Sequence, residues 1–174
     1  MRLVPAALAV AVASLALAAP AGATTLVLPD GTQRPQPYQS WIDDAHVPTP
    51  AGAVTLSLDG CGGMAGCSPQ GERLIELSPD WRLPRVLLHE LGHVFDDTMP
   101  AWARTRFEAI IGTHGPWASA ASDSPPEEQF AEAYSLCARH AAIRERYYGA
   151  YMYAPTPAQH RRVCALIRAA SARP

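Results

Sequence analysis

The sequence predicts an α+β domain in which a small β-sheet packs on one central helix and further helices follow. Residues 54–58 and 73–77 alternate apolar and polar side chains, as half-buried strands do. Residues 83–97 form an apolar segment of helical character, and three more helical segments come after it. Strands that precede a run of helices in the chain are typical of α+β folds.

The first 23 residues have the pattern of a signal peptide. Arg2 supplies the positive start, residues 3–19 are rich in alanine, valine and leucine, and Ala21 and Ala23 are small residues at the −3 and −1 positions. We expect cleavage after Ala23 and a secreted, extracellular protein with no further membrane association. An uncleaved membrane anchor is the alternative, but the apolar run is short for a span and no stop-transfer pattern follows it.

The mature chain has the length of one domain. Residues 24–53 contain five prolines, which favours an extended or partly disordered arm anchored by Tyr38, Trp41 and Ile42. Residues 54–174 then form the domain itself, in which we see no internal repeat. The formal net charge is −2 and no basic stripe is present, so a nucleic-acid partner is not expected. We expect a monomer.

Four cysteines remain after export, and an even number in a secreted chain indicates disulfides. Their order in the sequence favours the pairs Cys61–Cys67 and Cys137–Cys164 among three connectivities. The first pair would close a glycine-rich loop at the tip of a hairpin formed by residues 54–58 and 73–77. The second would join two helices. A cysteine metal site is the alternative, but no C-x-x-C pair exists.

Local signals place the helices. Ser78, Pro79 and Asp80 indicate a turn or a helix start. A strong helix entrance at residues 124–128 combines a polar cap, two prolines and two acids. Residues 112–126 look like a loop, and residues 147–153 are aromatic and irregular. The expected helices span residues 83–97, 102–111, 124–140 and 156–170.

The pentapeptide His89-Glu90-Leu91-Gly92-His93 is the most informative motif of the chain. Histidines four residues apart project from one face of a helix, so both imidazoles can reach one metal ion. Glu90 can then take a proton from a metal-activated water. This arrangement is the H-E-x-x-H signature of zinc metallopeptidases. The structural alternative is a buried helix with two hydrogen-bonded core histidines.

A catalytic zinc ion needs three protein ligands and one open position. Six residues after His93, where one class of these enzymes has its third ligand, this chain has Met99. Asp96 is too close to His93 along the helix to bind the same ion and suits a supporting or capping role better. Glu128 and Glu132 share one face of the later helix, so the first can bind zinc while the second holds a ligand histidine. Glu128 is favoured as the ligand, with Glu132 and Glu127 as the alternatives.

These two motifs together resemble those of gluzincin zinc metallopeptidases. H-E-x-G-H-x-x-D followed by E-x-F-A-E-A-aromatic is similar to small single-domain gluzincins and to the catalytic domain of anthrax lethal factor, and the resemblance covers residues 54–140. It implies a zincin-like fold, Glu128 as the third zinc ligand and a supporting role for Glu132. It also implies that the strand before the motif helix, residues 73–77, lines the cleft as the substrate rail.

The chain departs from this family in one respect. Lethal-factor-like enzymes have a tyrosine shortly before the third ligand that stabilises the oxyanion, but residues 117–126 contain none. The candidates to replace it are His114, His140, Tyr147 and Tyr148. Without such a group, zinc alone would stabilise the oxyanion and the enzyme would be slow.

The sequence therefore predicts a secreted zinc metallopeptidase in which Glu90 is the general base for the hydrolysis of peptide bonds. One alternative is a zinc hydrolase of non-peptide or cell-wall amides, for which a deformylase-like site would use Cys67 as a ligand. The other is a non-catalytic binding module with a structural zinc ion. Such a module would have no need of Glu90.

Overall fold

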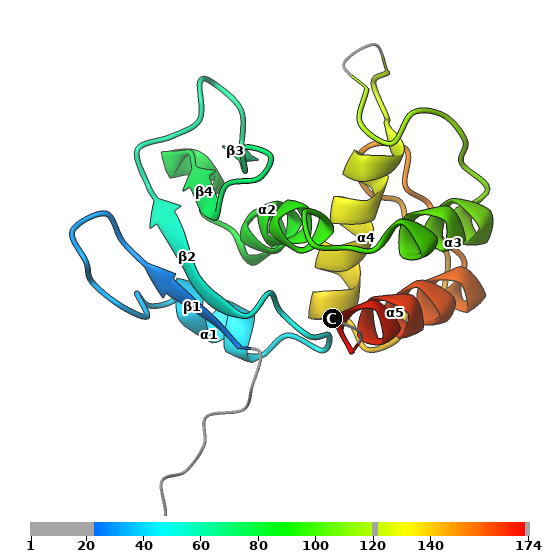
Figure 1. Ribbon diagram of the computed structural model, residues 1–174, viewed down its shortest axis with the longest axis horizontal. Coiled ribbons are helices and arrows are strands. Elements are labelled where there is room, and N and C mark those ends of the chain that lie inside the picture. Colours follow the sequence, from blue (N-terminus) through cyan, green and yellow to red (C-terminus); the bar gives the residue numbers. More distant parts are fainter. Residues whose placement is uncertain (1–22, 120–121, 173–174) are drawn as a thin grey trace, which may run out of the picture.

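The computed structural model describes residues 23–119 and 122–172, and it confirms the expected α+β class. Figure 1 shows a small sheet on one side of helix α2 (Pro84–Asp96) and the later helices on the other. These are α3 (Ala101–Ile111), α4 (Pro126–Arg139) and α5 (Pro157–Ser171). The expected signal peptide, apart from Ala23, lies outside the described residues.

The sheet contains four strands in the order β1-β2-β4-β3. They are β1 (Thr24–Val27), β2 (Gly52–Ser57), β3 (Gly66–Cys67) and β4 (Leu74–Leu77). The sequence predicted that residues 54–58 and 73–77 form a hairpin. This prediction is wrong, because the corresponding strands β2 and β4 pair in parallel. Parallel pairing needs a long connection, and residues 58–73 provide one. Part of that connection, β3, pairs antiparallel with the other side of β4 and forms the edge of the sheet.

The segment expected to be an extended arm instead belongs to the folded domain. Its first residues form β1, which pairs in parallel with β2, and residues Tyr38–Asp43 form helix α1. The buried amide of Gln39 accepts a hydrogen bond from the backbone N–H of Leu26 at 2.8 Å and donates one to the carbonyl of Thr24 at 3.0 Å. Gln39 thus occupies hydrogen-bonding groups of β1 that an edge strand would otherwise leave unpaired.

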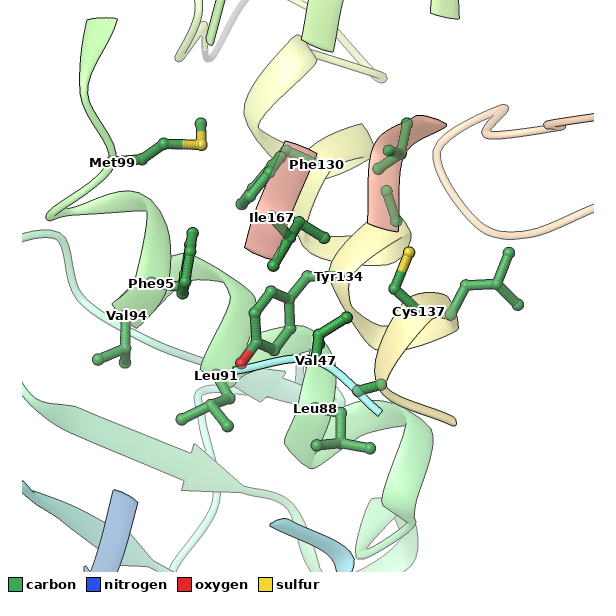
Figure 2. Packing of buried hydrophobic residues seen from close by; sticks show 14 of the residues in the cluster. Val47, Leu88, Leu91, Val94, Phe95, Met99, Phe130, Tyr134, Cys137 and Ile167 are labelled. Carbon is green, nitrogen blue, oxygen red and sulfur yellow. The ribbon is translucent and has the colours of Figure 1, made fainter. Parts of the chain in front are cut away.

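The hydrophobic core extends from the sheet through α2 and α4 to α3 and α5, and Figure 2 shows the part of it where α2 meets α4. Phe95 of α2 packs on Tyr134 of α4 with ring centroids 5.3 Å apart. The Tyr134 hydroxyl donates to the carbonyl of Pro48 at 2.9 Å, so the segment before β2 is also held against the core. Burial of large apolar side chains stabilises such a crossing by about 1.5–3 kcal/mol per residue.

The predicted helix boundaries agree with the structure to within about two residues, the margin by which methods of assignment differ. Gly112 ends α3 in the left-handed conformation, with φ of 78°. Thr156 begins α5 with a capping box closed by Gln159. Both expected disulfides, Cys61–Cys67 and Cys137–Cys164, are present. No described helix has the length and apolar character needed to cross a membrane.

Candidate metal centre

Helix α2 presents His89, Glu90 and His93 to a common cavity. The two histidines lie one turn apart on the same helix face, with ring centroids 5.1 Å apart. Leu87, Leu88 and Leu91 are buried in the core and fix the orientation of the helix. The alternation of core-facing and cavity-facing residues follows directly from the helical period.

Gly92 explains how α4 comes close enough to complete the site. A Cβ atom at this position would lie only 2.9 Å from the Cα of Ala131 and 3.1 Å from the Cβ of Tyr134. Only glycine therefore allows α2 and α4 to cross at this distance. The close crossing brings the first turn of α4, with its glutamates, to the motif histidines.

Glu128 of that turn faces both histidines. Its Oε2 lies 3.1 Å from Nε2 of His89 and 3.6 Å from Nε2 of His93. One ligating atom from each of these three residues lies within 4.8 Å of the other two. Two imidazoles and one carboxylate form a donor set that suits a divalent transition metal. The structure thus brings together the three residues that the sequence singled out.

Two further carboxylates lie behind the histidines. Glu132 Oε2 is 3.6 Å from Nδ1 of His89, and Glu127 Oε1 is 3.7 Å from Nδ1 of His93. Each imidazole therefore has a carboxylate on the side away from Glu128, which fixes the ring and the tautomer that exposes Nε2. Glu132 and Glu127, the alternative ligands, occupy these outer positions. The hydroxyl of Tyr147 donates to Glu132 Oε1 at 3.0 Å.

Burial and mutual charge set the protonation of these groups. Burial alone would lower the pKa of His93, but the carboxylates of Glu127 and Glu128 raise it to about 10. The pKa of Glu128 is lowered: burial opposes this, and the hydrogen bonds from the two histidines outweigh it. Burial raises the pKa of Glu90. A carboxyl with a raised pKa is suited to exchange a proton near neutral pH.

The cavity has a volume of about 640 Å³. Its wall opposite α4 is formed by the Cys61–Cys67 loop and β3, and the backbone of Gly66 lies directly against Glu90. A Cβ at position 66 would be 2.9 Å from Glu90 Oε1. The expectation that residues 73–77 form the substrate rail is wrong, because β4 is paired on both sides and β3 is the edge strand at the cavity.

Asp96 does not face the cavity. It accepts hydrogen bonds from Nε of Arg104 at 3.0 Å and from Nε1 of Trp117 at 2.8 Å. The carbonyl of Trp117 in turn accepts from the backbone N–H of Glu127 at 3.1 Å. Asp96 therefore supports the start of α4 through Trp117 and contacts neither histidine through a described hydrogen bond.

The structure places none of the four candidate oxyanion groups at the cavity wall. Tyr147 holds Glu132, Tyr148 is 79% exposed, and His114 is exposed in the loop before α4. His140 follows α4, and its carbonyl hydrogen-bonds His160 at 2.9 Å.

Tyr151 lines the cavity and was missed from the sequence. Its ring stacks on His89, with centroids 5.3 Å apart and planes 21° apart. Burial and the nearby charges of Glu128 and Glu90 raise its pKa to about 12, so its hydroxyl keeps its proton. The sequence showed that residues 147–153 are aromatic, but it did not show which tyrosine lines the cavity. The turn at Tyr151, where φ is 51°, determines this.

Two other groups of residues have metal-ligating atoms within reach of one another: Cys137, His160 and Cys164, and Cys61, Cys67 and Glu76. In both groups the two sulfur atoms are joined in a disulfide, and the described part of the chain has no free cysteine. Cys67 therefore offers no thiolate for a deformylase-like site. A disulfide sulfur is a poor metal ligand because the ligand form is the thiolate.

Searches with this chain matched no protein-family model, no curated protein and no solved structure.

Proposed function

We propose that this protein is a secreted, zinc-dependent metallopeptidase. The observation that carries the proposal is the convergence of His89 Nε2, His93 Nε2 and Glu128 Oε2 beside the buried carboxyl of Glu90. Bonds of 2.0–2.2 Å to a tetrahedral zinc ion would set the ligand atoms roughly 3.4 Å apart. The separations of 3.1 and 3.6 Å between Glu128 and the histidines agree with that value.

Zinc bound by these residues would polarise the scissile carbonyl and lower the pKa of water. Glu90 then accepts the proton of the attacking water and delivers it to the leaving amine. Its raised pKa, caused by burial, favours both directions of this transfer. Glu132 and Glu127 keep the imidazoles oriented with Nε2 toward the ion.

Two features of the cavity support a peptide substrate. The outer side of β3 offers backbone groups to which an extended chain can add as a further strand, next to Glu90. Tyr151, which stacks on His89 at the cavity wall, supplies a protonated hydroxyl that can donate a hydrogen bond to the developing oxyanion. In this proposal Tyr151 replaces the tyrosine that residues 117–126 lack.

Export is part of the proposal because both cysteine pairs are oxidised. Disulfides form and persist in extracellular and other oxidising environments and are rare in the cytosol.

The test is a cleavage map of a mixed peptide library, read by mass spectrometry, with zinc content measured on each protein. We expect wild type to cleave, Glu90→Ala to keep zinc but cut nothing, and Glu128→Ala to lose zinc. A chelator should abolish every cut made by wild type. Full zinc occupancy in Glu128→Ala would refute the ligand assignment. A zinc-loaded wild type that cuts no peptide would refute peptidase activity and leave only a metal site.

A further inference from the structure

Arg85 lies on α2 one turn before His89, and its side chain lines the same cavity. Four helical residues correspond to a rise of about 6 Å. Since an extended peptide advances about 3.3 Å per residue, Arg85 lies within one or two substrate residues of the metal centre. Among the described residues that line the cavity, it is the one with a permanently charged basic side chain.

The guanidinium of Arg85 has no carboxylate partner among the residues that the structure describes. It forms no hydrogen bond or ion pair with another described residue, and it stacks over the ring of Trp81 at 5.5 Å from the centroid. This stacking holds the guanidinium plane while its N–H groups remain free.

The acidic residues of the cavity do not compensate this charge. Glu127, Glu128 and Glu132 each lie within 3.7 Å of a histidine nitrogen, so their carboxylates are paired with the imidazoles and not with Arg85. Glu90 is buried and lines the cavity beside the two histidines. Within the part of the chain that the structure describes, the cavity therefore has its negative groups gathered around the metal centre and one unpaired cation a helical turn away.

We infer that Arg85 selects peptides that carry a carboxylate one or two residues from the cleaved bond. The carboxylate belongs either to an aspartate or glutamate side chain or to the C-terminus of the peptide. A guanidinium recognises both in the same way, through paired N–H donors. This inference deepens the proposed peptidase function and rests on it.

The first experiment compares kcat/KM for peptides that differ at one position, with Glu, Gln or Lys at each of the three residues on either side of the cut. A further pair of peptides ends one or two residues after the cleaved bond, one with a free C-terminal carboxylate and the other with an amidated C-terminus. For an exposed charge pair we expect wild type to prefer Glu over Gln about two- to fivefold at one position. Arg85→Gln should abolish this preference, and Arg85→Glu should transfer it to Lys.

The matched control is Arg161→Gln, which removes an exposed arginine of α5 outside the cavity lining. It should keep the wild-type preference. If the free C-terminus is preferred and internal Glu is not, the ligand is the terminal carboxylate. An equal rate for Glu and Gln peptides at every position, with no effect of the C-terminus, would overturn the inference.

A binding measurement separates this inference from the peptidase proposal. Peptidyl hydroxamates with Glu or Gln beside the metal-binding group are titrated into zinc-loaded wild type and Arg85→Gln by calorimetry. Tighter binding of the Glu compound to wild type alone supports Arg85 even if no peptide is cleaved. Equal binding of both compounds refutes the role of Arg85 while peptidase activity stands. Failure of both compounds to bind overturns the inference together with the proposed site.

Discussion

Gly66→Ala should impair the proposed general base without removing a charged group. A Cβ at position 66 would lie 2.9 Å from Oε1 and 3.0 Å from Cγ of Glu90, and 3.1 Å from Cγ1 of Val86. Contacts of 3.4 Å or more are ordinary, so the Glu90 side chain or β3 must move by about half an ångström. The backbone of Gly66 lies in a strand, where alanine is tolerated. The effect therefore comes from side-chain contact alone.

A displacement of 1 Å in a catalytic group can cost about a hundredfold in rate. We therefore expect Gly66→Ala to lower kcat/KM about ten- to a hundredfold. Zinc content should be unchanged, since His89, His93 and Glu128 lie elsewhere in the cavity. Crowding of this kind typically destabilises a protein by about 1–3 kcal/mol. The assay combines peptide hydrolysis, zinc content and thermal unfolding on the same preparation.

A double-mutant cycle with Glu90→Ala tests the stated mechanism. Because Glu90→Ala is expected to cut nothing, the cycle is read in thermal stability. If Gly66 acts by leaving room for Glu90, then Gly66→Ala should destabilise the protein less once the Glu90 side chain is shortened to alanine. A folded Gly66→Ala protein with wild-type activity would refute the reasoning. So would an equal loss of thermal stability with and without the Glu90 side chain.

Three further outcomes are expected. Glu132→Gln should weaken zinc binding about ten- to a hundredfold, because His89 loses the carboxylate on its Nδ1; an unchanged affinity in competition with a chromophoric chelator would contradict this. Tyr151→Phe should lower kcat about a hundredfold with little change in KM. A rise in KM with kcat unchanged would argue against an oxyanion donor. In the metal-free protein the pKa of His93 is raised to about 10, so the folded state binds more protons than the unfolded state between pH 6.5 and 10. Stability against urea should therefore be full below pH 6.5 and fall as the pH rises through this range. His93→Gln should reduce that fall, and the part that remains is expected from His89, whose pKa, against the effect of burial, is also raised by Glu128 and Glu132.

The helices could be predicted from the sequence because their signals are local. Apolar residues at helical spacing, prolines in first turns and the glycine at the end of α3 each act within a few neighbours. The pairing of strands could not be predicted in the same way. Residues 54–58 and 73–77 alternate as strands do, but alternation specifies which face is buried and not whether the neighbour runs parallel or antiparallel. The order β1-β2-β4-β3 depends on where residues 58–73 pack.

The arm shows a second limit of local signals. Proline frequency favoured an extended segment, but the parallel pairing of β1 with β2 and the burial of Ile42 hold it in the domain. Both are tertiary contacts between residues far apart in the chain. They outweigh the local preference because each ordered residue gains a partner in the sheet or the core.

By itself the sequence determined the chemistry of the candidate site, because His89, Glu90 and His93 are brought together by the period of one helix and need no other element. It also placed Glu128 and Glu132 on one face of α4 for the same reason. The tertiary structure alone decided which carboxylate faces the histidine Nε2 atoms, that Glu127 lies behind His93, and that Tyr151 rather than its neighbours reaches the cavity. These choices depend on the distance and angle at which α2 and α4 cross at Gly92, and on the turn that directs Tyr151 inward. Such geometry results from packing between segments distant in the chain, which no local periodicity encodes.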